Sequence, residues 1–347
     1  MIRFGDCCIG SGQPCFIIAE AGVNHNGDPA LARRLIAAAH AAGADAVKFQ
    51  TWITEKIAVP QARTAEYQKT NLGGEESQFA MLKKLELGYA VFTELKAEAE
   101  RSGILFLSTP DEEDSCDFLD RLGVPLFKIG SGEITNLPYL RHVARKGKPV
   151  ILSTGMATLG EVECAVRAME EQGNRQLVLL HCVSSYPAAP ADCNLRAMET
   201  LRLAFGYPVG FSDHTLGRDV AVAAVALGAC VLEKHFTLDV NMEGPDHRAS
   251  LDPSELVGLV KAVRQVESAM GDGAKRPSAA ELTTRAVVQK VYVAARDLRA
   301  GELVREDCVA LRRSSAGLPA AQWPLLRGRR LKQAVVVFSP ITPEMLE

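Results

Sequence analysis

Two histidines in the second half of the chain each close a short apolar run. His214 ends "VGFSDH" and His235 ends "CVLEKH". If these runs are neighbouring parallel strands, their imidazole rings meet at the same edge of the sheet. Two imidazoles with nearby oxygen ligands suit a divalent metal, Mn²⁺ first, with Mg²⁺ or Co²⁺ as alternatives. No third His or Cys completes a closed zinc cage, and a single His at a strand end is more often a hydrogen-bonded structural residue.

Two lysines lie within other apolar runs, Lys48 in "AVKFQ" and Lys128 in "LFKIG". A buried lysine is costly unless an anion pairs with it. The turn in "KIGSGE" adds backbone N–H groups that can face an oxyanion. Hydroxyl donors follow other runs, at Thr109, Ser131, Ser153 and Ser212. These groups predict a site for a small phosphorylated acid. The alternative is that the lysines pair internally with Glu20, Glu133 or Glu233, which explains the charge balance but not the hydroxyls.

Eight short β-type runs alternate with helical segments and must position these side chains. The runs are 16–20, 46–50, 104–109, 126–130, 150–154, 177–183, 209–213 and 230–235. Eight such repeats predict an α/β fold of the (β/α)8 TIM-barrel type, in which polar residues at the carboxyl ends of the strands face the mouth. An open doubly wound sheet is the alternative, but no GxGxxG follows the first run.

Composition excludes several classes of protein. The chain has 347 residues, 47% of them hydrophobic, and a net charge of -3, so we expect no nucleic-acid partner and no attraction to an anionic membrane. We find no apolar run long enough to span a membrane and no signal peptide, and nine cysteines without a CxxC pair indicate reduced thiols. A cytoplasmic location is therefore predicted.

The pattern changes after about residue 269. "AMGDGAKRPSAAE" reads as a linker, and the short runs "VYVAARDL", "CVALRR" and "AVVVF" follow it. We expect a barrel domain over 1–272, a linker over 273–284 and a small β-rich domain over 285–347.

Motifs along nearly the whole chain resemble those of the sialic acid synthase family. They include "IIAEAGVNHNGD", "GADAVKFQT", "KIGSGE", "LLHCVSSYPA", "GFSDHT" and "GPDHRASLDP". The segment "ARDLRAGELVREDCVALRR" is similar to the antifreeze-like (SAF) domain of that family. The resemblance implies a metal-dependent condensation of phosphoenolpyruvate with an N-acyl hexosamine, N-acetylmannosamine first. The products would be phosphate, released by C–O cleavage, and a nine-carbon 2-keto acid, N-acetylneuraminate.

The same resemblance implies roles for individual residues. The phosphoenolpyruvate pocket would be lined by Lys48, Gln50, Thr109, Lys128, Ser131, Ser153 and Ser212, and the metal ligands would be His214 and His235. The acid–base and sugar-contacting residues would be Glu20, Glu133, Tyr186 and Asp246, with Asn71 from a loop. Arg313, next to Arg312, would reach the sugar across a domain-swapped homodimer. The chain departs from the family pattern at two positions. Ser184 stands at a sugar-contacting position that is Asn in some members, and an aromatic residue expected shortly before the SAF core is replaced near Gln289.

Three other functions are weighed against this one. Legionaminate synthesis from a 2,4-diacetamido-trideoxyhexose is the nearest, since "CNLRAMETLRLAFGYPVGFSDHT" resembles those enzymes, whereas "AEAGVNHNG" disfavours pseudaminate synthesis. A metal-dependent sugar-phosphate aldolase would use Lys128 as a Schiff base. A non-catalytic binding or ice-interacting protein is the third alternative, but it would have no use for the charged residues at the strand ends, where buried lysines would only destabilise the barrel.

Overall fold

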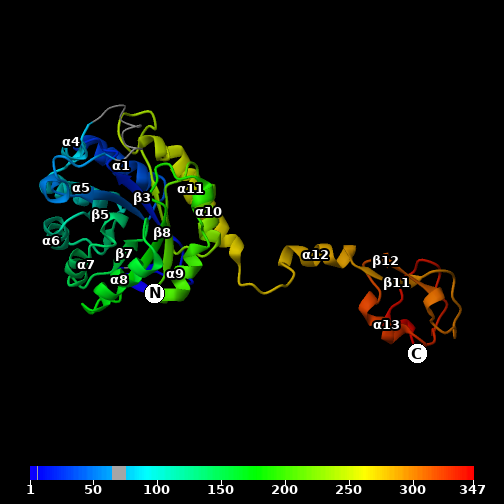
Figure 1. Ribbon diagram of the computed structural model, residues 1–347. Helices are drawn as coiled ribbons and strands as arrows, with labels where there is room; N and C mark the ends of the chain where they lie inside the picture. Colours follow the sequence, from blue (N-terminus) through cyan, green and yellow to red (C-terminus); the bar gives the residue numbers. More distant parts are fainter. Residues whose placement is uncertain (6, 65–75) are drawn as a thin grey trace. The chain divides into compact units, whose positions relative to one another are not determined.

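The computed structural model describes residues 1–5, 7–64 and 76–347. These residues form two compact units, Met1–Gly271 and Asp272–Glu347 (Figure 1). The first unit holds the eight expected strands, and the second holds the β-rich segment. None of the helices in the described part of the chain is long and apolar enough to cross a membrane.

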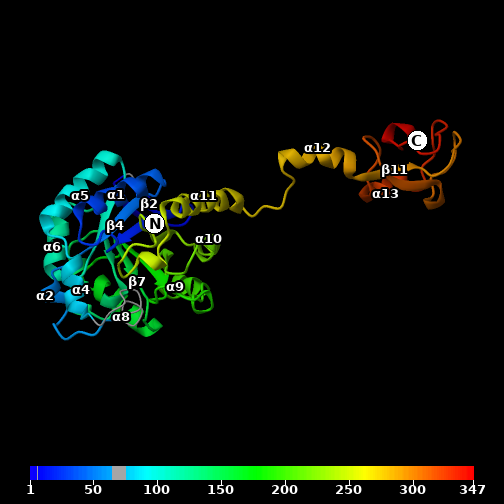
Figure 2. The same cartoon turned by 90° about the horizontal axis from the view of Figure 1, so that it is seen from above.

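Eight parallel strands form the centre of the first unit (Figures 1 and 2). They are β3 (Phe16–Gly22), β4 (Ala46–Thr51), β5 (Leu105–Pro110), β6 (Phe127–Ile129), β7 (Val150–Ser153), β8 (Leu177–Cys182), β9 (Val209–Asp213) and β10 (Val231–His235). Their order is β5-β4-β3-β10-β9-β8-β7-β6, and β5 also lies beside β6, so the sheet closes. The (β/α)8 barrel is confirmed, and the open doubly wound sheet is wrong.

Helices surround the barrel (Figure 2), and most of them bury their apolar faces against it, while Met81 and Leu85 pack in a separate cluster with Val23 and Trp52. They are α1 (Pro29–Ala41), α2 (Thr54–Ile57), α4 (Gln78–Leu85), α5 (Tyr89–Ser102), α6 (Glu113–Leu122), α7 (Leu137–Ala144), α8 (Leu159–Glu170), α9 (Ala197–Phe205), α10 (Asp219–Ala226) and α11 (Pro253–Met270). Short 3-10 turns include η1 (Ser131–Glu133), η2 (Pro190–Asp192) and η3 (His247–Ala249). Helix α1 begins as its sequence indicates, because the Asp28 side chain accepts a hydrogen bond from the Ala30 N–H and Pro29 is the first helical residue.

A hairpin that the sequence reading did not identify precedes the barrel. Strands β1 (Ile2–Phe4) and β2 (Cys7–Ile9) pair antiparallel. Phe4 and Ile9 are buried with residues from the amino ends of the strands, and the Phe4 ring meets the Phe16 ring edge-on at 5.7 Å. The hairpin therefore covers the face of the barrel opposite the predicted site.

The second unit differs from the expected one in two places. Helix α12 (Ala279–Val288) occupies part of the stretch 273–284 that was expected to be a linker, and a capping box of Ser278 and Glu281 starts it. Strands β11 (Lys290–Ala294) and β12 (Val309–Arg313) pair antiparallel, but "AVVVF" forms only an isolated bridge, from Val335 to Leu298. The remaining elements are α13 (Trp323–Leu326) and the turns η4 (Glu306–Cys308), η5 (Ala320–Gln322) and η6 (Pro343–Met345), around a small core of their own.

Candidate active site

A cavity of about 460 Å³ opens at the carboxyl ends of the barrel strands. It collects most of the predicted site residues from across the first unit. Those that line it are Glu20, Lys48, Gln50, Thr109, Lys128, Ser131, Ser153, Ser184, Tyr186, Ser212, His214 and His235. Residues separated by more than 200 positions in the chain thus share one cavity, as the closed barrel requires.

The floor of the cavity is a buried network of two lysines and two glutamates. Lys48 Nζ lies 2.8 Å from Glu20 Oε2 and 3.7 Å from Glu233 Oε2. Lys128 Nζ lies 3.2 Å from Glu233 Oε1. The internal pairing that the sequence left as an alternative is therefore present with Glu20 and Glu233, whereas Glu133 forms no ion pair with either lysine in the described structure.

Hydroxyl oxygens accept hydrogen bonds from both lysines. Lys48 Nζ donates to Thr109 Oγ1 at 2.9 Å, and Lys128 Nζ donates to Ser153 Oγ at 2.7 Å. Ser212 Oγ donates to Glu233 Oε1 at 2.9 Å. An incoming anion would therefore meet ammonium groups and hydroxyl donors that the barrel already holds in position.

The two glutamates of the floor differ in protonation. Burial raises the pKa of Glu20, and the opposing effect of Lys48 does not cancel it. Burial would also raise the pKa of Glu233, but Lys128 and Lys48 together outweigh it and lower that pKa below the usual value. Glu233 therefore stays ionised, and Glu20 is the carboxyl group that can gain or lose a proton near neutral pH.

The two predicted metal ligands face each other at the rim. The rings of His214 and His235 lie 5.5 Å apart between centroids, and the Tyr186 ring lies 4.1 Å from His214. Burial lowers the pKa of both imidazoles, that of His214 to about 4, so both are neutral at pH 7, the form that binds metals. His214 Nδ1 donates to the Val183 carbonyl at 2.6 Å, so the lone pair is on Nε2, which lies 3.4 Å from Ser212 Oγ.

The donor set at the rim fits a divalent cation. His235 Nδ1 is buried and has no hydrogen-bond partner in the described part of the chain, whereas buried polar atoms normally have one. The nearest carboxylate oxygen, Asp246 Oδ2, is 3.9 Å away, and burial raises the pKa of Asp246 to about 6. Two neutral imidazoles beside a carboxyl group are a suitable set of ligands for Mn²⁺ or a similar ion.

Two predicted residues of the first unit are not among those that line the cavity. Asp246 lies next to His235, as above. Glu133 belongs to η1 after β6, and its Oε2 accepts from Asn136 Nδ2 at 2.7 Å. Arg313 and its neighbour Arg312 are both exposed on β12 of the second unit. Asn71 lies outside the described residues.

The three ionisable side chains at the end of the "CVLEKH" strand point to both faces of the barrel wall. Glu233 and His235 line the cavity, but Lys234 points the other way and donates to Asp213 Oδ2 at 2.7 Å. Alternation along a strand accounts for this division. Lys234 and Asp213 are therefore a buried structural pair rather than part of the ring of site residues.

Two polar residues of the cavity were missed in the sequence. Asp111 follows β5, two residues beyond Thr109, so strand alternation places both on the same side. That spacing was a usable signal. Gln78 begins α4, far from any strand end, and only the fold brings it to the cavity.

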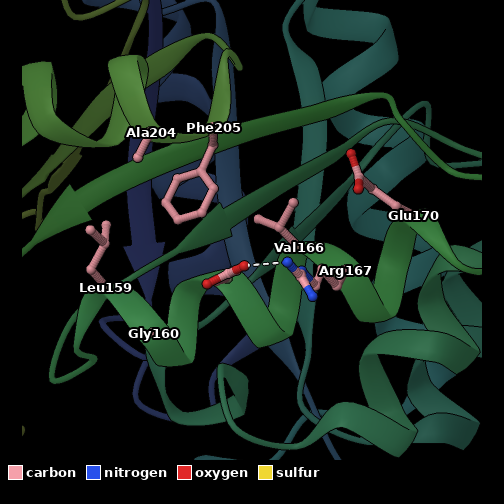
Figure 3. Close-up of a pocket in the computed structure, with 8 residues that line it drawn as sticks. Leu159, Gly160, Val166, Arg167, Glu170, Ala204 and Phe205 are labelled. Atoms are coloured by element: carbon pink, nitrogen blue, oxygen red, sulfur yellow. Dashed lines mark ion pairs between the residues drawn. The ribbon is translucent and has the colours of Figure 1, made fainter.

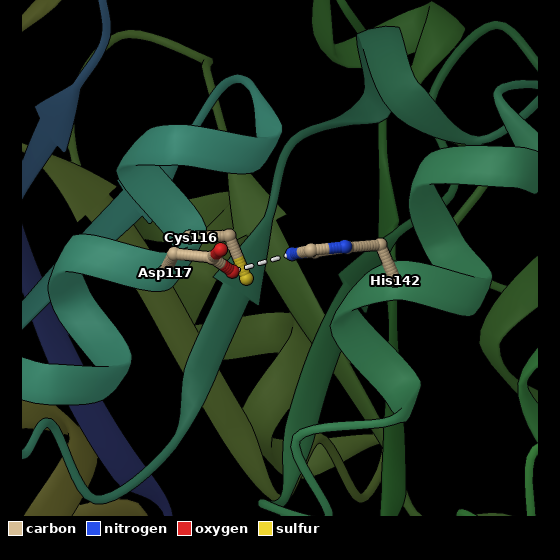
Figure 4. A group of neighbouring side chains, drawn as sticks. All are labelled: Cys116, Asp117 and His142. Carbon is tan, nitrogen blue, oxygen red and sulfur yellow. Dashed lines mark hydrogen bonds and ion pairs between the residues drawn. The ribbon is translucent and has the colours of Figure 1, made fainter.

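A second group of metal-binding residue types lies on the outer helices (Figure 4). His142 Nε2 is 2.6 Å from Asp117 Oδ1, and Cys116 is adjacent. Lys146 Nζ already pairs with the same Asp117 oxygen at 2.6 Å, and burial raises the pKa of Cys116 to about 12. A cation beside the carboxylate and a protonated thiol make this cluster a poor metal site.

Another hollow, of about 430 Å³, lies between α8 and α9 on the outside of the barrel (Figure 3). Its charged groups are paired: Glu163 with Arg167 at 2.6 Å, and Glu170 with Arg175 and Tyr207. Exposed pairs of this kind contribute little energy and carry no evident chemistry.

The fold and the cavity define a (β/α)8-barrel enzyme that binds its substrates at the carboxyl ends of the strands. The model of the NeuB family matches residues 35–275, and that of the SAF domain matches 289–347. The chain belongs to the NeuB family, is an enzyme of the synthase type found there, and carries a SAF domain. The predicted family resemblance is confirmed.

Relatives with printed activities are similar over almost the full chain. The N,N'-diacetyllegionaminic acid synthase of Campylobacter jejuni is 48% identical, over 90% of this chain and 94% of its own length. That of Legionella pneumophila is 46% identical, over 97% and 96%. The structure of an N-acetylneuraminic acid synthetase from Leptospira borgpetersenii in complex with citrate has a TM-score of 0.72 and 37% identity, covering 83% of this chain and 96% of that one.

Proposed function

We propose that the chain condenses phosphoenolpyruvate with an acylamino hexose to give a nine-carbon 2-keto sugar acid and phosphate. The acceptor we propose first is a 2,4-diacetamido-trideoxyhexose, the alternative in the sequence reading. The observation that carries the reaction is the single cavity in which two buried ammonium groups and their hydroxyl partners lie beside a neutral imidazole pair.

Phosphoenolpyruvate would bind over the charged floor. Its phosphate and carboxylate need several cationic and N–H or O–H donors, and Lys48, Lys128 and the surrounding hydroxyls supply them. The lysines are held by Glu20 and Glu233, so they need little reorganisation when the phosphate leaves. Bringing both substrates together in one orientation can supply about 7–11 kcal/mol of the barrier.

The acceptor aldehyde would lie at the rim, where His214 and His235 would hold a divalent metal, with Mn²⁺ as first choice. When bound, such a metal acts as a Lewis acid toward the aldehyde oxygen. C3 of phosphoenolpyruvate attacks the aldehyde carbon, so the C2–C3 double bond becomes a single bond, the aldehyde oxygen takes up a proton and becomes a hydroxyl, and water then adds at the electron-deficient C2. Glu20, whose pKa burial raises, would accept the proton of that water. Phosphate leaves with its bridging oxygen as the C2–O bond breaks.

Two acceptors remain as candidates, and similarity ranks them. Relatives that make diacetyllegionaminate reach 48% and 46% identity, whereas the similar structure that makes N-acetylneuraminate reaches 37%. Ser184, where some family members have Asn, lines the same cavity. N-acetylmannosamine, the first expectation from the sequence, is the second candidate on the strength of that structure.

The aldolase alternative conflicts with the surroundings of Lys128. A Schiff base needs a free amine, but Lys128 donates to Ser153 and pairs with Glu233. Treatment with borohydride and a ketose phosphate should therefore leave the mass of the protein unchanged, and a covalent adduct at Lys128 would favour the aldolase.

A phosphate-release assay tests the proposed reaction. Phosphoenolpyruvate and Mn²⁺ would be held constant while the acceptor is varied among 2,4-diacetamido, 2-acetamido and unsubstituted hexoses. We expect the largest kcat/KM with the diacetamido sugar and none without an acylamino group. Equal rates with all sugars, or none with any, would contradict the proposal.

The bond that breaks can be followed separately. With ¹⁸O in the bridging position of phosphoenolpyruvate, C–O cleavage carries the label into phosphate. Label retained in the sugar acid would mean P–O cleavage and would overturn this step.

A further inference from the structure

The cavity contains two polar side chains to which the reaction above gives no task. Asp111 and Gln78 both line it. Within the described structure, the Asp111 carboxyl group forms no hydrogen bond or ion pair, and its backbone N–H donates to the Thr51 carbonyl at 3.1 Å. The Gln78 side chain also forms no hydrogen bond with a described residue, while its backbone N–H donates to the Ala62 carbonyl at 3.2 Å. A partly buried carboxyl group and a carboxamide that have no partner among the described residues are available to a ligand.

The strand order places these groups across the cavity from the imidazole pair. Asp111 follows β5, and His214 follows β9; these strands are four apart in either direction around the barrel. Gln78 lies in the connection between β4 and β5, on the side of Asp111. An acceptor with its aldehyde at the imidazoles can therefore extend its more distant carbons toward Asp111 and Gln78.

The neighbours of Asp111 distinguish it from the charged floor. Burial raises its pKa to about 7, and Glu133 adds to the increase, while Lys48 and Lys128 oppose it. Asp111 comes two residues after Thr109, which already contacts Lys48, so along the strand it lies beyond the floor and toward the opening. This position belongs to the layer of the cavity that would contact the acceptor rather than phosphoenolpyruvate.

The chemistry of the two side chains matches an acylamino group. A carboxamide donates an N–H and accepts at its oxygen, so it can pair with both the carbonyl and the N–H of an amide. A carboxyl oxygen accepts an N–H or a hydroxyl. In a 2,4-diacetamido sugar, the acylamino group at C4 is the one further from the aldehyde, and N-acetylmannosamine has a hydroxyl there.

We infer that Gln78 and Asp111 bind the second acylamino group of the acceptor and so select a 2,4-diacetamido sugar over a mono-acetamido one. This inference rests on the proposed function, because it names the part of the cavity that reads the acceptor. A site built to hydrogen-bond a substrate group discriminates strongly against analogues that lack it, since its polar groups are then left unpaired.

Steady-state phosphate release tests the inference, with each acceptor varied at saturating phosphoenolpyruvate and phosphoenolpyruvate varied at saturating acceptor. The selectivity is the ratio of kcat/KM for the diacetamido sugar to that for N-acetylmannosamine. In Gln78→Leu and in Asp111→Ala we expect this ratio to fall about tenfold or more, with the KM for phosphoenolpyruvate unchanged. Gln13→Ala, an exposed glutamine before β3 at the opposite face of the barrel, is the matched control and should keep the ratio of the unsubstituted protein.

Each other outcome overturns a distinct claim. If the unsubstituted protein uses the diacetamido sugar but both variants keep its selectivity, the inference is wrong and the proposed function stands. The inference is also wrong if the variants lose activity equally with both acceptors, provided that thermal melting shows them folded. If the unsubstituted protein uses N-acetylmannosamine alone, the proposed acceptor is wrong and the inference falls with it.

Discussion

At the scale of single residues, the cavity holds two neighbouring glutamates, Glu20 and Glu233, in different protonation states. Glu20 and Glu233 contact the same ammonium group, yet only Glu233 has a second lysine beside it. That second positive charge decides which carboxyl group stays ionised and which can move a proton. The imidazoles are held neutral by burial, which prepares them for a metal rather than for proton transfer.

The metal site can be tested at His235. His235→Ala should remove a ligand and lower kcat by more than the roughly 10–100-fold that follows loss of an outer partner of a metal site. Binding of Mn²⁺ by the folded protein, measured by equilibrium dialysis, should weaken in parallel. His142→Ala, in the outer cluster of Figure 4, is the control and should bind Mn²⁺ normally. Unchanged dialysis for His235→Ala would exclude the ligand role.

Asp111 gives a pH-dependent prediction about stability. Its pKa is about 7 in the folded chain against 3.8 as the ordinary value, so the folded state holds the proton over a range in which the unfolded state has lost it. The favourable contribution of the protonated form is complete below about pH 4 and is lost as the pH rises through about 7.

Asp111→Asn keeps the shape and removes this titration. Its Tm should match that of the unsubstituted protein near pH 4 and exceed it by several degrees at pH 8, since each kcal/mol shifts Tm by about 2–4 °C in a chain of this size. Calorimetry at several pH values measures the difference. A Tm difference that does not change with pH would contradict a raised pKa at Asp111.

At the scale of elements, the strands decide which side chains take part in chemistry. Lys48 and Lys128 lie on the inner face and meet the cavity, whereas Lys234 lies on the outer face and is paired there with Asp213. The hairpin of β1 and β2 has a separate task at the other end, where it buries Phe4 and Ile9.

This separation of stability from function can be tested at Phe4. Phe4→Ala should destabilise the barrel by about 3 kcal/mol, because it leaves a hole beside Phe16. The KM for phosphoenolpyruvate should not change, since the cavity is at the other face. Urea unfolding and phosphate release measure the two effects. Phe338→Ala, at an exposed phenylalanine of the second unit, is the control; a raised KM for Phe4→Ala alone would show that the two faces are coupled.

At the scale of the whole molecule, the second unit needs a role in the proposed reaction. It has its own core, and α12 buries none of its residues within the chain. We propose, from the resemblance, that the SAF unit of one protomer completes the cavity of its partner in a domain-swapped homodimer, with Arg313 at the sugar.

Mixed dimers test this arrangement. Arg313→Ala and Glu20→Gln should each be inactive or nearly so as pure proteins. If the units cross over, a mixed dimer has one cavity with both residues intact, and up to about half of the normal activity per dimer should return. Arg312→Ala mixed in the same way shows which arginine has the role. Verified mixed dimers that remain inactive would count against the crossing.

Much of the site could be predicted because each strand of a barrel, with the residue at its end, can be recognised from a short stretch of sequence. Most of the apolar runs end in a polar residue, so the order of the runs is enough to place His214 next to His235 and Lys48 near Thr109. Asp111 could have been included by the same alternation. Gln78 could not, because the connection between β4 and β5 is long and its path follows no periodic pattern.

The sequence by itself determined the barrel, the family and the residue types that meet at its mouth, because buried strands and their polar ends leave a regular pattern. Only the tertiary structure decided that both lysines are neutralised from within, that Lys234 faces away, and that Asp111 and Gln78 complete the cavity. Those outcomes depend on distances of a few ångströms between side chains on different strands, and such distances have no counterpart in the spacing of residues along the chain.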